Sequence, residues 1–379
     1  MQTITAALLI HLSLLSCGLL AQTPPETWKE HWFEHNQLIK RVFYNNDIAV
    51  YFDDQVGPSI AWLNTFVNDA WWHTKRVYGN YGTENRLYAV FHTDKYSGGH
   101  PSTYMSSSHD NRNVIDCGPY SWKNGDDHEL ALITHEIAHI VELSSKNIGG
   151  SPAMAVWGDS KWAEIFIYDV YKYLGKNDQM QRVYNIWINQ ADDFPRANTF
   201  WFRDWFYPIY SKYGENAVLN RFYEQLAQYF PKNGNQYSRG MNMGEFVHFW
   251  SGAAGVNLKD QATQAFGWTS DYDNQFRQAQ SAFPFPYDAG VAKFYHGCPS
   301  TGFFAGLPVG DYRLSDMRKK GLHNDDISSI VVNPGYYVQL FEHDNFGGGS
   351  MRVTGTHSCL TTTGWNDRIS SLQVRKFAG

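Results

Sequence analysis

The spacing of hydrophobic positions changes along the chain. Two early runs, DIAVYFDD (47–54) and NRLYAVFHTD (85–94), concentrate β-branched and aromatic residues, which is typical of strands. From about residue 125 onward, apolar residues recur every three or four positions, as in VLNRFYEQLAQYF (218–230), and this spacing predicts helices. Strands followed by helices predict an α+β domain that opens with a small sheet.

A proline- and glycine-rich segment, FPFPYDAG (283–290), separates this part from a region of different pattern. After it come short β-like runs broken by glycine: AKFYHG (292–297), SSIVV (328–332), YYVQLFE (336–342) and SLQVRKF (371–377). We therefore expect two folded domains, an α+β domain over 22–287 and an all-β domain over 291–379.

The first 21 residues form an apolar run that ends in a small residue, Ala21. This pattern predicts a secretory signal peptide over 1–21, although the usual basic residue near its start is missing. A lipoprotein anchored through Cys17 is the alternative. No other stretch of the sequence suits a membrane span, and a net charge of -6 argues against nucleic-acid binding. We expect the mature protein to be secreted.

The segment DDHELALITHEIAHIVE (126–142) carries a specific chemical pattern. Its two leading aspartates suit the N-terminus of a helix. On that helix His135 and His139 lie four residues apart on one face, so both imidazoles can reach one metal ion. Glu136 lies about 100° round the helix, where its carboxylate can act as a base on water. Two imidazole ligands and a carboxylate base are what zinc-dependent hydrolysis requires.

A zinc site of this kind needs a third protein ligand. No third histidine follows His139 at the spacing of the extended motif. Within GDSKWAEIFIYDVYKYLG (158–175), which predicts a second helix, Glu164 lies on the flank of an apolar stripe, and we expect it to be the third ligand. Asp159 and Asp169 are alternatives. Asp169 can instead hydrogen-bond a ligand histidine from behind.

A HEIAH helix followed by a helix with a lone glutamate resembles the gluzincin metallopeptidases. The second helix is also similar to that of plant basic secretory proteins and enhancin-like peptidases. The resemblance is confined to these two helices. It implies a zincin-like catalytic domain in which His135, His139 and Glu164 bind zinc and Glu136 is the general base.

Two features around this motif stay open. The group that stabilises an oxyanion is usually His or Tyr, and Tyr168, Tyr237 and His248 are candidates, although His248 suits a packed helix better. The Gly/Ser-rich stretch 96–113 is either an edge strand that lines the cleft or a surface loop. His128, seven residues before His135, is expected to be structural.

The C-terminal region contains a near duplication. GLHNDDISSIVV (321–332) is repeated as TGWNDRISSLQV (363–374), and both copies contain N-D-x-I-S-S. Two copies of one unit predict a paired β module that buries one shared face. Calcium prefers hard oxygen ligands, which the Asn, Asp and Ser side chains and the turn carbonyls of these motifs supply.

These motifs resemble a microbial-type βγ-crystallin domain, which is a sandwich of two Greek keys with a calcium clamp. The resemblance implies that each ion takes oxygens from both motifs. The implied ligands are the carboxylates of Asp325 and Asp367, the hydroxyls of Ser328 and Ser370 and the main-chain carbonyls of Asp326 and Arg368, with Asn324 and Asn366 opening the motifs. The alternative is that the Asn-Asp pairs cap turns and the serines start strands.

The sequence has 4 cysteines, of which Cys17 falls in the expected signal peptide. Cys298 and Cys359 both lie in the C-terminal region, and an oxidising compartment favours a disulfide between them. Cys117 is then left single. The alternative is three buried free thiols.

Together these patterns predict a secreted zinc-dependent peptidase that hydrolyses protein or glycoprotein substrates. The calcium-binding module would serve stability or targeting. The alternative is a secreted adhesion or glycan-binding protein with an inactive zincin fold, which the 16% aromatic content also suits. A pure binder, however, would not require Glu136.

Overall fold

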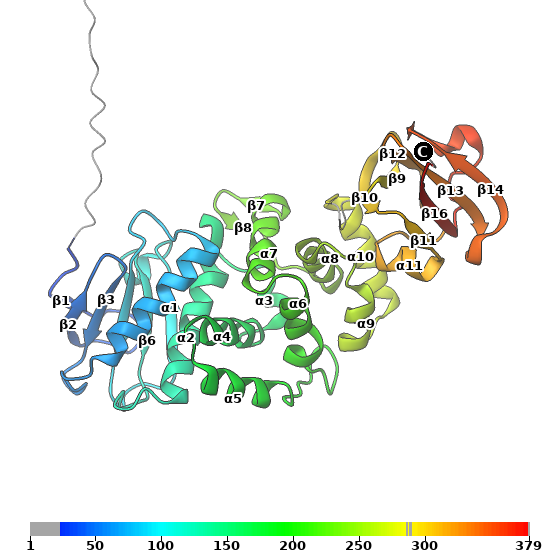
Figure 1. Ribbon diagram of the computed structural model, residues 1–379. Helices are drawn as coiled ribbons and strands as arrows, with labels where there is room; N and C mark the ends of the chain where they lie inside the picture. The colour runs from blue at the N-terminus through cyan, green and yellow to red at the C-terminus, as the bar shows by residue number, and fades with distance from the viewer. Residues whose placement is uncertain (1–22, 286, 288–289, 378–379) are drawn as a thin grey trace, which may run out of the picture.

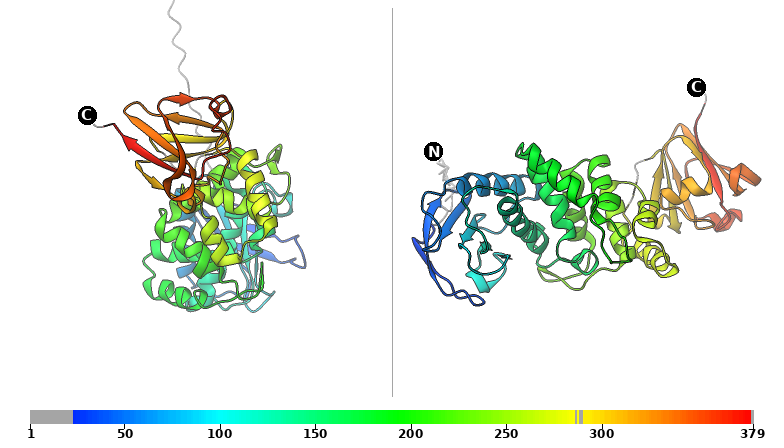
Figure 2. Two further views of the ribbon diagram at one scale, coloured as in Figure 1. Left: turned by 90° about the vertical axis from the view of Figure 1, so that its right-hand side faces the viewer. Right: turned by 90° about the horizontal axis from the view of Figure 1, so that it is seen from below.

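The computed structural model describes residues 23–285, 287 and 290–377. A sheet forms one end of an elongated molecule, helices fill the middle, and a β domain forms the other end (Figures 1 and 2). The expected signal peptide, with Cys17, lies outside the described residues. Over the described part of the chain, no helix combines the length and the apolar character needed to cross a membrane.

The N-terminal sheet has six strands in the order β1-β2-β3-β4-β6-β5. Their bounds are β1 Thr27–Lys29, β2 Leu38–Tyr44, β3 Ile48–Phe52, β4 Leu87–Phe91, β5 Gly99–Ser102 and β6 Asn113–Cys117. Strands β3, β4 and β6 run parallel, whereas β1, β2 and β5 pair antiparallel with their neighbours. Strands β3 and β4 lie within the two runs that the sequence predicted.

The parallel strands are buried on both faces, which explains their nearly continuous apolar sequences. On β3, Ile48, Val50 and Phe52 belong to the main core, whereas Ala49 and Tyr51 face a smaller core that contains tryptophans. Helix α1 (Trp62–Tyr78) connects β3 to β4, and α2 (Asp127–Ser144) contacts β5 and β6. The active-site candidates therefore sit where a buried sheet supports a helix.

A layer of helices continues the chain after α2 (Figure 1). Helix α4 (Lys161–Tyr173) is the second motif helix that the sequence predicted within 158–175, and it packs against α2. The remaining elements up to the β domain are η1 Ser107–His109, η2 Ser145–Asn147, α3 Met154–Trp157, α4 Lys161–Tyr173, α5 Asn177–Trp187, η3 Trp201–Phe206, α6 Tyr207–Lys212, α7 Asn216–Tyr229, β7 Lys232–Asn233, β8 Gln236–Tyr237, α8 Met243–Ala254, α9 Lys259–Phe266 and α10 Ser270–Ala282.

The C-terminal domain contains two four-stranded sheets, β10-β9-β12-β15 and β11-β16-β13-β14. The bounds are β9 Ala292–Gly297, β10 Thr301–Leu307, β11 Gly310–Tyr312, α11 Leu314–Lys319, β12 Ser329–Val332, β13 Tyr336–His343, η4 Asp344–Phe346, β14 Gly347–Val353, β15 Thr356–His357, η5 Leu360–Thr363 and β16 Ser371–Lys376. The two sequence copies exchange strands: β11 of the first pairs with β16, and β15 of the second pairs with β12. This exchange agrees with the paired β module that the duplication predicted and with the two Greek keys that the resemblance implied.

A disulfide joins the two copies. Cys298 follows β9, Cys359 precedes η5, and their Cα atoms are 5.0 Å apart. This confirms the expected pairing. Among the described residues Cys117 is a free cysteine, and its thiol is buried.

The β domain packs directly on the helical layer. The buried Gln280 of α10 bridges the two parts, because its Nε2 donates to the carbonyl of Gly321 (3.3 Å) and its Oε1 lies 3.1 Å from Nε2 of His323. Asn257 Nδ2 also donates to the carbonyl of Arg318 at 2.6 Å. The buried hydrophobic residues of both parts form one continuous cluster.

Candidate active site

Helix α2 presents the histidine pair. It begins with a capping box in which Asp126 Oδ1 accepts from the N–H groups of His128 (3.0 Å) and Glu129 (3.1 Å), and Glu129 Oε2 accepts from the N–H of Asp126 (3.2 Å). One turn apart on this helix, His135 and His139 place their Nε2 atoms 3.0 Å from each other. Two nitrogens about 2.0–2.1 Å from one tetrahedral zinc ion would be about 3.3 Å apart, so the pair fits a shared ion.

A buried carboxylate holds His139 from behind. Glu142 Oε2 lies 2.6 Å from His139 Nδ1, and Glu142 Oε1 accepts from Trp157 Nε1 at 2.7 Å. When Nδ1–H donates to Glu142, the lone pair of Nε2 is left for a metal, as in other carboxylate–histidine–metal arrangements. Burial favours neutral His139, but the hydrogen bond and charge of Glu142 raise its pKa overall. The i, i+3 spacing of these two residues could have revealed this support in the sequence.

We expected Asp169 either as a ligand or in this supporting role. Its carboxylate instead belongs to another buried group, in which Oδ2 lies 2.7 Å from His73 Nε2 and Oδ1 accepts from the hydroxyl of Tyr210 at 2.7 Å. Asp169 thus supports a histidine of α1, whereas Glu142 supports the ligand candidate.

Glu136 is a buried carboxyl group beside the histidine pair. It is 3% exposed, and within the described residues its Oε2 has no hydrogen-bond partner. Burial raises its pKa to about 7. Edge strand β5 passes close to it, because a Cβ at Gly99 would lie 2.8 Å from Glu136 Oε1. Residues 96–113 therefore include an edge strand, which was one of the two expected alternatives.

His135, Glu136 and Gly99 line a cleft of about 500 Å³. Its walls come from β5, α2, α4 and α5, and its volume is in the usual range for ligand sites. Polar side chains in the lining are His135, Glu136 and Glu164 with Tyr120, His128, Ser160 and Gln190, and the apolar ones include Leu132, Ile167 and Trp187. The cleft thus joins apolar walls to a few convergent polar groups.

Two of the predicted third-ligand carboxylates belong to this region, Asp159 beside the histidine pair and Glu164 in the cleft wall. Asp159 Oδ1 is 3.5 Å from His139 Nε2, and its Oδ2 is 3.9 Å from His135 Nε2, although this side chain is 75% exposed. Glu164 is buried in the cleft wall, and Gln190 Nε2 donates to its Oε1 at 3.3 Å. Burial raises the pKa of Glu164 to about 8. The structure therefore groups Asp159 most closely with the histidines and places Glu164 in the same cleft.

The three oxyanion candidates lie outside the residues that line the cleft. Tyr168 packs among other tyrosines, such as Tyr207 and Tyr210. Buried His248 has its Nε2 2.8 Å from the carbonyl of Phe283, as suits a packed helix residue. Tyr120 and His128 do line the cleft. Tyr120 was not among the expected candidates, and His128 was expected to be structural.

The two N-D-x-I-S-S motifs adopt matching loops. Asp325 and Asp367 have left-handed φ values of 53° and 54°. In each copy the preceding asparagine donates Nδ2–H to this aspartate, Asn324 at 2.6 Å and Asn366 at 2.7 Å. The N–H of Asp325 donates to the carbonyl of Ile369 at 3.2 Å, so the first loop reaches the second motif.

The other predicted calcium ligands lie in the same loops. The N–H groups of Ser328 and Ser370 donate to the carbonyls of Tyr295 (2.9 Å) and Phe341 (3.0 Å), so both serines also tie into strands. At the third motif position the copies differ. Burial raises the pKa of Asp326, whereas the guanidinium of Arg368 pairs with Glu342. This geometry agrees with both alternatives, a calcium clamp and turns capped by Asn-Asp pairs whose serines start strands.

No protein-family model matches the chain. Development-specific protein S of Myxococcus xanthus is 32% identical over 68 residues, which are 18% of this chain and 38% of that protein. The chain therefore spans well under half of this curated relative.

Solved structures give matches of similar extent. A βγ-crystallin domain from Flavobacterium johnsoniae is 44% identical, with coverage of 24% of this chain and 98% of that one and a TM-score of 0.23. The N-terminal domain of protein S is 26% identical, with coverage of 23% and 98% and a TM-score of 0.22.

Proposed function

We propose that the chain is a secreted zinc-dependent peptidase and that its βγ-crystallin-like C-terminal domain is a calcium-binding module. The observation that carries the peptidase part is the buried Glu136 carboxyl, which has an unpartnered oxygen among the described residues and lies next to the His135–His139 pair in a cleft. A buried acid without a partner is costly, and such groups cluster at functional sites.

The residues around the pair fit a zinc ion. His135 and His139 supply nitrogen ligands, and Asp159 is the carboxylate whose oxygens lie closest to their Nε2 atoms. The buried Glu164 lines the same cleft, and a cation there would favour its charged form, which burial disfavours. We keep Glu164 as the third ligand, with exposed Asp159 as its competitor. When bound, zinc supplies a Lewis acid that polarises a carbonyl and acidifies water.

Each remaining group then has a defined task. Glu136 takes the proton of the attacking water, and Glu142 holds the ring of His139 in one orientation. Strand β5 lies at the edge of its sheet and can pair an extended peptide through backbone hydrogen bonds. An extended substrate on β5 would pass directly beside Glu136, because Gly99 lies against that carboxyl.

The N-D-x-I-S-S loops would bind calcium through oxygens of Asn324, Asp325, Asp326, Ser328, Asn366, Asp367, Arg368 and Ser370. Left-handed aspartates and the Asp325–Ile369 hydrogen bond support this part of the proposal, because they bring the two motifs together.

A Glu136→Gln variant tests the peptidase part. It should retain zinc, because Glu136 is not a ligand, and lose about 10²–10⁴-fold in kcat/KM on a peptide or protein substrate, as expected for a lost general base. Substrate panels with and without a chelator establish the reaction first. If wild type cleaves nothing with zinc bound, or if Glu136→Gln cleaves at the wild-type rate, the proposal fails and the adhesion or glycan-binding alternative gains support.

A further inference from the structure

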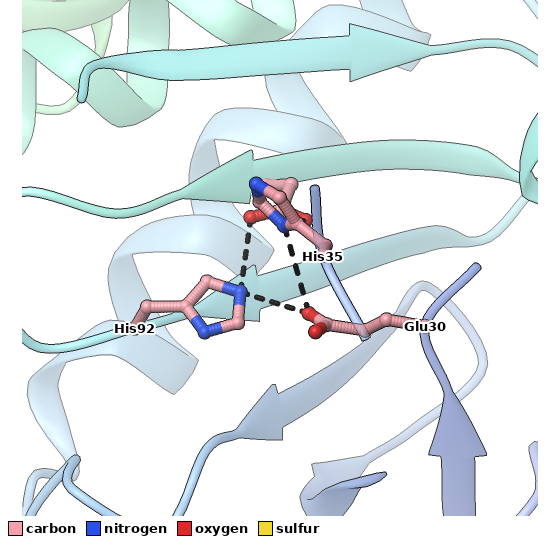
Figure 3. A group of neighbouring side chains, drawn as sticks. Glu30, His35 and His92 are labelled. Carbon is pink, nitrogen blue, oxygen red and sulfur yellow. Dashed lines mark ion pairs between the residues drawn. The ribbon is translucent and has the colours of Figure 1, made fainter. Parts of the chain in front are cut away.

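A second group of metal-ligand side chains lies in the N-terminal domain. Glu30 follows β1, His35 lies in the loop before β2, His92 follows β4 and Asp116 belongs to β6. All four are buried, with exposures of 1%, 5%, 0% and 1%. Each offers one ligand atom, and these four atoms lie within 4.8 Å of one another. Figure 3 shows Glu30, His35 and His92 converging from different segments.

The atoms that face the centre of this group lack hydrogen bonds. Within the described residues, Glu30 Oε1, His35 Nδ1, His92 Nε2 and Asp116 Oδ1 have no partner of acceptable geometry. They nevertheless lie close together: His92 Nε2 is 2.9 Å from Glu30 Oε1 and 3.2 Å from Asp116 Oδ1. His35 Nδ1 is 3.0 Å from Asp116 Oδ2 and 3.7 Å from Glu30 Oε1. Four buried polar atoms that converge without hydrogen bonds need another partner.

Three of these residues also have hydrogen-bond partners through their second polar atom. Glu30 Oε2 accepts from the N–H of Gln37 at 2.9 Å, and Asp116 Oδ2 accepts from Trp32 Nε1 at 2.8 Å. His92 Nδ1 lies 3.1 Å from Asp53 Oδ2, and Asp53 Oδ1 accepts two backbone N–H groups. These partners fix the orientation of three of the four side chains, as supporting hydrogen bonds do around metal ligands.

The charges of the group also call for a cation. With both histidines neutral, Glu30, Asp53 and Asp116 carry three negative charges. One positive charge stands nearby, because Lys95 Nζ lies 3.7 Å from Asp53 Oδ2. A divalent cation cancels the remaining two. Protonation of both imidazoles would balance the charge too, but His92 Nε2 has a single proton for two carboxylates.

We propose that Glu30, His35, His92 and Asp116 bind a zinc ion as a closed structural site. Two imidazole nitrogens and two carboxylate oxygens suit zinc better than calcium or magnesium, which prefer oxygen alone. Four protein ligands fill a tetrahedral zinc site and leave no position for a substrate. The site is therefore distinct in role from the cleft at His135.

The proposed ion would tie the N-terminal segment to the sheet. Glu30 and His35 both lie on the connection between β1 and β2, whereas His92 directly follows β4 and Asp116 belongs to β6, its parallel neighbour. The edge strand is connected as well, because His100 of β5 has its Nε2 3.8 Å from Asp116 Oδ2. His100 follows Gly99, so the ion would also stiffen the cleft wall beside Glu136.

Zinc counting tests this site without reference to the cleft. Full-length secreted protein carrying His135→Ala and His139→Ala is dialysed against buffer that contains excess calcium and from which other metal ions have been removed. The number of zinc ions per chain is then measured by mass spectrometry. We expect one zinc ion per chain to remain. A folded double variant that takes up no zinc overturns the proposal, whatever the fate of the peptidase assignment.

Ligand identity is tested in the same background. Adding the near-isosteric pair Glu30→Gln and Asp116→Asn should remove this zinc. The matched control His73→Gln changes a buried histidine that is paired with Asp169, and it should leave the zinc in place. Retention of zinc in the Glu30/Asp116 variant overturns the ligand set.

If that variant does not fold, zinc-edge X-ray absorption of the His135→Ala, His139→Ala protein identifies the ligands instead. It should show four light ligands, of which two are imidazoles. Sulfur in the coordination shell, or a shell without imidazole, contradicts the proposal.

Discussion

Gly99 of edge strand β5 lies so close to Glu136 of α2 that a Cβ added to Gly99 would be 2.8 Å from the Oε1 atom of Glu136 and 2.9 Å from its Cγ. The absence of a side chain at position 99 therefore determines where the carboxyl of Glu136 can lie. Helix and strand approach each other at the point where the proposed base must meet its substrate.

Gly99→Ala should accordingly lower kcat/KM by about 100-fold, because a shift of roughly 1 Å in a reacting group has an effect of this size. Zinc content should stay unchanged, since no ligand moves. The control is Gly57→Ala, where the nearest side-chain atom to an added Cβ is 3.7 Å away. Wild-type activity in folded Gly99→Ala would show that the contact does not position the base.

Glu142→Gln should weaken zinc binding at the cleft by about 10–100-fold, because it removes the charged acceptor that orients His139. Competition with a chelator of known affinity measures this loss. Asp169→Asn is the matched control, since it removes a carboxylate from a different buried histidine, His73. Equal losses in both variants would indicate general destabilisation instead of a role at the metal.

The third ligand can be assigned by a pair of variants. Glu164→Gln should reduce zinc affinity at the cleft more than Asp159→Asn, because the buried carboxylate gains more from the ion than the exposed one. Both are measured in protein that also carries Glu136→Gln, so that proteolysis does not interfere. The reverse order would assign the position to Asp159, which lies nearer to the histidines.

The raised pKa of Glu164 also predicts that the stability of the metal-free protein depends on pH. Its pKa is about 8 in the folded protein against an ordinary 4.5, so between these values the unfolded chain binds fewer protons and stability falls as pH rises. Glu164→Gln should therefore gain stability over wild type across this window, by a total on the order of 5 kcal/mol. The gain should level off above pH 8.

Urea unfolding at several pH values in the presence of a chelator measures this difference. Glu26→Gln, at an exposed position, is the control variant. A Glu164→Gln difference that stays constant from pH 5 to 8 would contradict the burial argument.

Calcium should raise the stability of the β domain through the tandem loops. At a hundredfold excess over Kd the gain is about 2.7 kcal/mol if binding is confined to the folded state. Asp325→Ala with Asp367→Ala should abolish the calcium-dependent rise in melting temperature of the full chain, whereas Asp311→Ala in the same domain should keep it. Zinc occupancy should be the same in all three, and a persisting calcium shift in the double variant would refute the ligand assignment.

Local patterns in the sequence predicted what depends on neighbours along the chain. The cap at Asp126, the one-turn spacing of His135 and His139, and the strands around Val50 and Ala89 all follow from periodicities within a few residues. The pairing of Cys298 with Cys359 followed from their shared place in the C-terminal region and from the expected oxidising compartment.

Groups assembled by the tertiary fold could not be predicted in this way. Glu30 and Asp116 are 86 positions apart and meet only because strand order brings β1 and β6 onto one sheet. Nothing in the spacing of these residues marks them as partners. The sequence offered Asp159 as an alternative ligand, but its place beside the histidines depends on the short turn after α3. Nothing in the sequence predicted that Asp169 meets His73 across two helices.

The exchanged strands β11 and β15 mean that each copy of the repeat completes the sheet of the other. A protease that cuts the connection at 333–335, between β12 and β13, would break the backbone without releasing either piece. The fragments would migrate separately on a reducing denaturing gel, yet they would elute as one particle from a native sizing column. With Cys298 and Cys359 still joined, they would remain one covalent molecule even in urea.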